Sequence, residues 1–143
     1  FFISYSSQDL HRSTDTISDL RGNGERILLV DDVEEQRQIG KELLTYLGYE
    51  TMVAESGEEA VEFLAGNHVD LVILDMIKEQ GMDGLDTYRQ MLALKPGQKA
   101  VVTSGYSETG RLTETLALGA GPYIKKPYSW KNLGRAVKAA LAG

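Results

Sequence analysis

Short apolar runs alternate along the chain with segments whose apolar residues recur at helical spacing. Leu71 to Leu74 form one such run, and four consecutive apolar residues suit a strand that is buried on both faces, as in a parallel sheet. The run at 50–54 is more polar and is therefore predicted at a sheet edge. The predicted strands cover residues 27–30, 50–54, 71–74, 100–102 and 123–124.

Between these strands, apolar residues three or four positions apart predict amphipathic helices. Ile39, Leu43 and Leu47 form the first series, and Gly48 is placed to end that helix. Ser56 and Ser129 are expected to cap two later helices. The inward-facing residues predicted for the later helices are Ala60, Val61, Leu64, Leu85, Tyr88, Met91, Leu92, Leu112, Leu116, Leu133, Val137 and Leu141.

Five strand–helix units in strict alternation predict an α/β fold with a parallel sheet and helices on both faces. Right-handed connections then place the carboxyl ends of all five strands at one edge. Residues 1–24 are polar, show only a weak helical spacing at Ile17 and Leu20, and end in Gly22-Asn23-Gly24. We interpret residues 1–24 as a linker or the remnant of an upstream domain, and residues 25–143 as one domain.

The composition and charge of the chain exclude several classes of site and partner. The 143 residues include no cysteine and two histidines, which excludes thiolate metal sites and makes a histidine-rich zinc site improbable. A net charge of −6 argues against a nucleic-acid surface. No apolar run reaches the length of a membrane span, so this segment is predicted to make no membrane contact.

Polar residues stand at or just past the predicted strand ends: Asp31, Asp32, Asp75, Ser104 and Lys126. Three neighbouring carboxylates repel one another unless a cation lies among them, and an oxygen-only ligand set suits Mg²⁺. A lysine and a serine hydroxyl nearby can bind phosphoryl oxygens. Such a site is equipped for phosphoryl transfer to a central carboxylate.

The order of these motifs resembles the receiver domain of two-component response regulators over roughly residues 25–143. The resemblance rests on Leu29-Val30-Asp31-Asp32, Leu74-Asp75, Met82-Asp83-Gly84, Ser104-Gly105 and Tyr123-Ile124-Lys125-Lys126-Pro127. It implies a flavodoxin-like sheet with the strand order 2-1-3-4-5. It also implies a cytoplasmic protein.

The resemblance assigns roles to individual residues. Asp75 would be phosphorylated by a histidine kinase or a histidine phosphotransfer domain. Asp32 would bind Mg²⁺ directly, Asp31 would act largely through water, and the backbone carbonyl of Ile77 would be a further ligand. Asp75 would complete the metal site.

Three more residues acquire roles in the same way. Ser104, chosen over Thr103 because of its distance from Lys126, would be the switch hydroxyl. Lys126 would pair with phosphoryl oxygens, and its bond to Pro127 would be cis. Tyr123 would be the aromatic residue that rotates as Ser104 moves.

The sequence departs from the family after Asp75, where the loop lacks the usual Met-Pro pair and is one residue longer. The side chains of Ile77 and Tyr106 could alter access of the hydrolytic water and hence the lifetime of the phosphoryl group. Plainer roles also exist: Asp31 and Asp32 could cap the following helix, and Tyr123 could be a packing residue.

The cellular context has several possible forms. Residues 1–5 resemble the closing strand of a histidine-kinase ATP-binding domain, which predicts the C-terminal receiver of a hybrid sensor histidine kinase, with a stand-alone receiver as the alternative. By family analogy, the fourth helix, fifth strand and fifth helix would form a partner or homodimer surface.

Three other functions occur as alternatives on such a sheet. A Mg²⁺-dependent aspartyl phosphatase would need a second aspartate where Ile77 stands, and a flavin carrier would need a phosphate loop where Asp31 and Asp32 stand. A phosphorylation-independent pseudo-receiver would not need the complete site.

Overall fold

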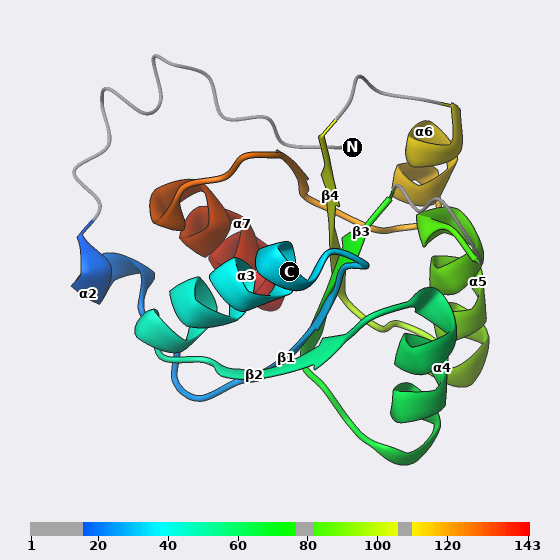
Figure 1. The fold of residues 1–143 in the computed structure, drawn as a ribbon, viewed down its shortest axis with the longest axis horizontal. Coiled ribbons are helices and arrows are strands. Elements are labelled where there is room, and N and C mark those ends of the chain that lie inside the picture. The colour runs from blue at the N-terminus through cyan, green and yellow to red at the C-terminus, as the bar shows by residue number, and fades with distance from the viewer. Residues whose placement is uncertain (1–15, 77–81, 106–109) are drawn as a thin grey trace.

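The computed structural model describes residues 16–76, 82–105 and 110–143. Ile77 and Tyr106 lie outside these ranges. Within them, five parallel strands form one sheet in the order β2-β1-β3-β4-β5 (Figure 1). The strands are β1 (Arg26–Val30), β2 (Glu50–Ala54), β3 (Leu71–Asp75), β4 (Ala100–Ser104) and β5 (Tyr123–Lys125). The predicted strand order and the edge position of β2 are confirmed.

Helices cover both faces of the sheet (Figure 1). They are α2 (Ile17–Leu20), α3 (Glu34–Tyr46), α4 (Gly57–Gly66), α5 (Gly84–Leu94), α6 (Gly110–Ala117) and α7 (Trp130–Ala142). The α3 and α7 helices pack on one face, with α2 beside them, and α4, α5 and α6 pack on the other. No helix in the described ranges is both long and apolar enough to span a membrane.

The alternation of side chains along each strand divides the core in two. On β3, Leu71 and Ile73 face α3 and α7, whereas Val72 and Leu74 face α4, α5 and α6. We call these the α3–α7 core and the α4–α6 core. Since β3 lies between β1 and β4 and all its residues are buried, its carboxyl end opens where the two neighbouring strands also end.

The predicted helix ends are largely confirmed. The Ser56 hydroxyl accepts a hydrogen bond from the Glu59 amide, and the Ser129 hydroxyl accepts one from the Asn132 amide. Gly48 follows α3 with φ +90°, a left-handed conformation that glycine adopts without strain.

One residue of the first predicted helix face is wrong, whereas Leu43 packs against the α3–α7 core and Leu47 is buried in it. The side chain of Ile39 is 41% exposed, whereas Gly40 and Leu44 are buried against the sheet. The buried stripe therefore runs through Gly40, Leu44 and Leu47. The four-residue spacing wrongly included Ile39 and omitted Gly40, because a glycine contributes nothing to an apolar pattern.

The end of the predicted linker packs against the domain. Leu20 of α2 is buried in the α3–α7 core next to Gly134 of α7. The Gly22 amide donates to the Leu47 carbonyl at 2.7 Å, and the Gly24 amide donates to the Gly48 carbonyl at 2.9 Å. The boundary between residues 24 and 25 stays a prediction, but residues 16–24 are attached to the sheet domain.

Candidate functional site

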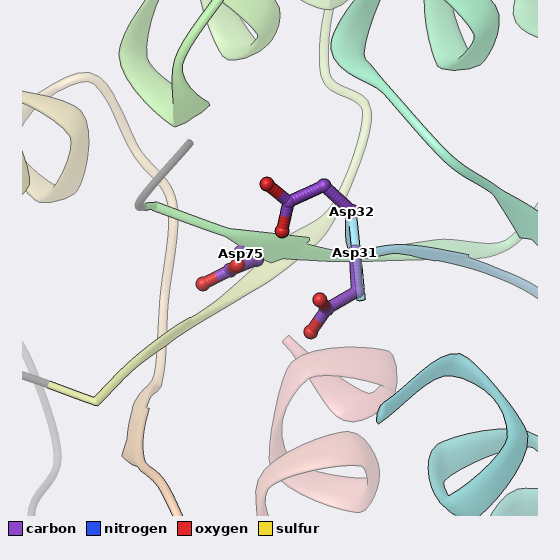
Figure 2. A group of neighbouring side chains, drawn as sticks. All are labelled: Asp31, Asp32 and Asp75. Carbon is purple, nitrogen blue, oxygen red and sulfur yellow. The ribbon is translucent and has the colours of Figure 1, made fainter. Parts of the chain in front are cut away.

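Three carboxylates meet at the carboxyl edge of the sheet. Asp75 is the last residue of β3, and Asp31 and Asp32 directly follow β1. Figure 2 shows Asp31 and Asp32 projecting to different sides of the end of β1, with Asp75 beside them. One oxygen from each residue lies within 4.8 Å of the other two. Residues distant in sequence are thus brought together as predicted.

The three carboxylates differ in exposure. Asp31 and Asp75 are only 2% and 6% exposed, whereas Asp32 is exposed. A buried carboxylate needs partners, and Asp31 is held through both its carboxylate and its backbone. Its Oδ1 accepts a hydrogen bond from the Val33 amide at 3.0 Å, and its backbone carbonyl accepts one from the Arg37 guanidinium at 2.8 Å.

Capping does not account for Asp31 and Asp32. The N-cap of α3 is Val33, which makes no side-chain capping bond. The bond from Asp31 to the Val33 amide shapes the turn before the helix instead. The negative charges still lie near the positive end of the α3 dipole.

Lys126 supplies a positive charge to the site. Its Nζ lies 2.5 Å from Asp31 Oδ2 and 3.6 Å from Asp75 Oδ1. The Lys126 amide donates to the Ser104 carbonyl at 2.8 Å, which ties the end of β5 to the end of β4. One ammonium group cannot neutralise three carboxylates, so the cluster retains a net negative charge that attracts a cation.

Both candidate switch hydroxyls are buried at the end of β4. Thr103 is in register with Asp75 and Ser104 is in register with Lys125. Because successive residues of a strand point to opposite faces, the two hydroxyls lie on opposite sides of the sheet. The choice of Ser104 stays a prediction.

Two further predictions concern β5 and its end. Tyr123 is half-buried and packs against the α4–α6 core. The bond between Lys126 and Pro127 is cis, as expected, and the bond between Gly121 and Pro122 is also cis. The Ile77 carbonyl, predicted as a ligand, lies outside the described residues.

Sequence reasoning missed Tyr128. Burial, followed by the charges of Asp31 and Asp75, raises the pKa of Tyr128 to about 12. A Cβ at Gly40 in the middle of α3 would lie 3.0 Å from the Tyr128 hydroxyl, so the glycine leaves room for the phenol. Its position directly after Lys126 and Pro127 was a signal that could have suggested a place beside the site.

Arg37 was also missed. Its guanidinium contacts the Asp31 carbonyl and lies 3.4 Å from the Glu55 carboxylate. The sequence offered only its place one turn into the helix that follows Asp31 and Asp32, which is also the place of many solvated residues. Its role in holding the backbone of Asp31 follows from tertiary packing.

The residues present fit a hard divalent cation. The donors are carboxylate oxygens, they lie within reach of one ion, and Asp32 leaves an exposed side for water. Mg²⁺ is bound in this way, by one or two carboxylates and several waters, with positions left for phosphate oxygens. The cluster could therefore hold such an ion.

Comparisons with known proteins agree with this arrangement. A family model described as the response regulator receiver domain matches residues 27–138. Sporulation initiation phosphotransferase F of Bacillus subtilis is 32% identical over 117 residues, which cover 82% of this chain and 94% of that protein. Chemotaxis protein CheY of Thermotoga maritima is 32% identical over 106 residues, which cover 73% of this chain and 88% of CheY.

Longer proteins match as well. The transcriptional regulatory protein ZraR of Escherichia coli is 34% identical over 116 residues, and this chain covers 26% of its length. Among solved structures, a CheY-like receiver domain protein from Methanospirillum hungatei superposes with a TM-score of 0.77 at 29% identity, covering 83% of this chain and 94% of that chain.

Proposed function

The chain belongs to the response regulator receiver domain family of two-component systems, and from this premise we propose that Asp75 accepts a phosphoryl group from a phosphohistidine. The observation that carries the proposal is the meeting of three carboxylates and one lysine at the end of β3. Lys126 Nζ lies 2.5 Å and 3.6 Å from two of those carboxylates.

The transfer exchanges one bond for another. An oxygen of Asp75 forms a bond to phosphorus as the bond between phosphorus and the histidine nitrogen breaks, and the nitrogen keeps the electron pair. Asp31, Asp32, Asp75 and the Ile77 carbonyl would hold Mg²⁺. When bound, that ion would neutralise charge on the phosphoryl oxygens.

Lys126 and Ser104 would act on the product. The Lys126 ammonium would exchange part of its contact with Asp31 and Asp75 for a phosphoryl oxygen. The Ser104 hydroxyl would donate to another phosphoryl oxygen, drawing the end of β4 toward Asp75. Tyr123, which packs on the α4–α6 core one strand away, would respond to that movement as the switch aromatic.

Acetyl phosphate with Mg²⁺ tests the proposal without a kinase. We expect the wild-type chain to gain one phosphoryl group by intact-mass analysis and Asp75→Asn to gain none. Asp70→Asn, at the opposite end of the β3 region, is the control and should react like the wild type. Equal labelling of Asp75→Asn would contradict the proposal, and absence of any wild-type response to beryllofluoride would favour the pseudo-receiver.

The protein context is a separate part of the proposal. We propose that the donor is a histidine kinase or a histidine phosphotransfer domain, and that this receiver belongs to a hybrid sensor histidine kinase. A stand-alone receiver is the alternative, and the relatives include proteins of both receiver length and much greater length. The gene sequence upstream decides: an ATP-binding kinase signature there supports the hybrid form, and its absence contradicts it.

The surface of α6, β5 and α7 is proposed as the site of partner binding or homodimer formation. Support comes from family analogy and from its place next to Ser104 and Lys126, whose contacts would change on phosphorylation. Sedimentation of the chain with and without beryllofluoride tests it. A monomer that stays a monomer would leave partner binding as the role of this surface.

A further inference from the structure

Three ion pairs join α5 and its N-cap to α6, two of them made by Arg111 and one by Arg89. The Arg111 guanidinium, in the first turn of α6, contacts both carboxylate oxygens of Asp83 and lies 3.1 Å from Asp86 Oδ1. One turn further along both helices, Arg89 pairs with Glu114. The Arg111 contacts therefore lie at the helix ends nearest the phosphorylation site, and the Arg89 contact lies farther from it.

Asp83 is itself firmly held. It is the N-cap of α5, where its Oδ1 accepts a hydrogen bond from the Asp86 amide at 3.0 Å and its backbone carbonyl accepts one from the Thr87 hydroxyl at 2.8 Å. Its hydrogen bonds with Arg111 are the main cause of a lowered pKa of the Asp83 carboxyl, which keeps that partner charged.

The start of α5 is fixed to the strand that carries Asp75. The Gly84 amide donates to the Met76 carbonyl at 3.4 Å, and a Cβ at Gly84 would lie 2.8 Å from the Met76 Cα. A close approach of this kind leaves little room for relative movement. The α5 N-terminus is thus a fixed point beside β3.

The α6 helix is shorter than α5 and buries fewer residues. It has eight residues, and Leu112, Thr115 and Leu116 are its buried side chains. Leu112 and Leu116 belong to the α4–α6 core, and α6 packs on α5. Arg111 and Glu114 add the polar attachment on the exposed side.

We propose that Arg111 is a positioning residue: by holding the first turn of α6 to Asp83 and Asp86, it restrains Ser104 in the unphosphorylated state. The inference rests on the proposed roles of Asp75 and Ser104. Val102 of β4 and Leu112 of α6 lie in the same core cluster, two residues before Ser104 and one residue after Arg111, so a shift of the β4 end toward a phosphoryl group disturbs the packing of the first α6 turn. The contact between Arg111 and the fixed α5 N-terminus opposes that movement.

Beryllofluoride with Mg²⁺ provides the test, because it mimics the phosphoryl group without turnover. The single tryptophan, Trp130, begins α7 four residues after Lys126 and offers a fluorescence signal for the titration. We expect Arg111→Gln to lower the beryllofluoride concentration at half-saturation by about two- to fivefold. This is the range of free energy that an exposed multidentate ion pair contributes.

Three further variants separate positioning from general helix packing. Glu114→Gln breaks the outer ion pair between the same two helices and should leave the half-saturation point near that of the wild type. Arg111→Lys keeps the charge without the guanidinium fork, so it should fall between the wild type and Arg111→Gln. Asp86→Asn weakens only the contact between Arg111 and Asp86. If circular dichroism shows that Arg111→Gln is poorly folded, the same titration is made with Asp86→Asn, and a shift in the same direction is expected.

The outcomes are distinct. An Arg111→Gln titration equal to or weaker than that of the wild type overturns the inference, as does an equal shift in Glu114→Gln. A wild-type chain that does not respond to beryllofluoride overturns the proposed function itself.

Discussion

The hydroxyl of Tyr49 is buried in the α3–α7 core with no hydrogen-bond partner among the described residues. A buried polar atom without a partner costs free energy, whereas a phenylalanine keeps the ring packing and removes the cost. We therefore predict that Tyr49→Phe equals or exceeds the wild type in free energy of unfolding at pH 7, by up to about 2 kcal/mol. Urea unfolding followed by circular dichroism measures it, and a clear loss of stability would contradict it.

The same variant should respond differently to alkaline pH. Burial, followed by the charge of Glu25, raises the pKa of Tyr49 to about 12 from its usual 10.0. The unfolded chain loses this proton first, so the stability contribution is complete below pH 10 and is lost as pH rises from 10 to 12. The wild-type free energy of unfolding should fall by about 2 to 3 kcal/mol over this range because of Tyr49. Tyr49→Phe has no phenol at this position and should not show this part of the fall.

Site residues at the ends of strands could be predicted from the sequence, whereas site residues that are positioned by helix packing could not. Asp31, Asp75 and Lys126 were predictable because parallel strands end at one edge. Tyr128 and Arg37 reach the same edge through the positions of α7 and α3, which no local pattern specifies. The error at Ile39 has a related origin, since Gly40 faces the sheet without an apolar side chain to mark it.

Among the elements, α2 contributes more than a linker would. Leu20 is buried next to Gly134, where a Cβ would lie 3.2 Å from the leucine side chain. Thr16 and Asp19 form a capping box that fixes the start of this four-residue helix. A short helix is not stable by itself, so α2 owes its structure to this contact.

Truncation and substitution test the role of α2. We predict that a chain beginning at Glu25 is less stable than one beginning at Thr16, because Leu47 and Tyr49 lose the residues that cover them. Leu20→Ala should lower the free energy of unfolding by about 2 to 3 kcal/mol. Leu118→Ala is the matched control, because Leu118 is 43% exposed and should change stability by less than about 0.5 kcal/mol. Equal stability of the two truncated chains would show that α2 does not contribute to the stability of the domain.

The five strands and the five longer helices could be predicted because each carries its own periodicity and end signals. The α2 helix could not, because Ile17 and Leu20 supply too little pattern in four residues. Its capping box becomes informative only when a surface to receive Leu20 is known. That surface is built by Gly134 and Leu47, which lie far away in the sequence.

For the whole molecule, the strand order creates the acidic cluster. Asp31 and Asp75 lie at the carboxyl ends of β1 and β3, which are neighbours in the sheet but are separated by two helices and a strand along the chain. In the unfolded chain these carboxylates are apart, so a cation that needs all of them binds only the folded state. Alternation of strands and helices predicted this shared edge, but not the distances within it.

Binding to the folded state alone must raise stability. We predict that millimolar Mg²⁺, added after removal of metal with a chelator, increases the free energy of unfolding of the wild-type chain. Asp32→Asn should reduce this increase, because it removes an exposed ligand without uncovering a buried charge. Urea unfolding at a series of Mg²⁺ concentrations measures it.

Lys126 makes this prediction sharper. Its ammonium group lies 2.5 Å from Asp31 Oδ2, so it competes with a bound cation for the negative charge of the three carboxylates. Lys126→Gln should be less stable than the wild type without metal, because the buried Asp31 loses its partner. It should also gain more stability from Mg²⁺ than the wild type does, and each tenfold gain in affinity for Mg²⁺ adds about 1.4 kcal/mol at saturating metal.

Lys125→Gln is the control, because it removes the same charge at an exposed neighbouring residue. It should gain no more stability from Mg²⁺ than the wild type. If the two variants responded alike to Mg²⁺, the cation would be drawn by the net charge of the chain and not by the cluster that the strand order assembles.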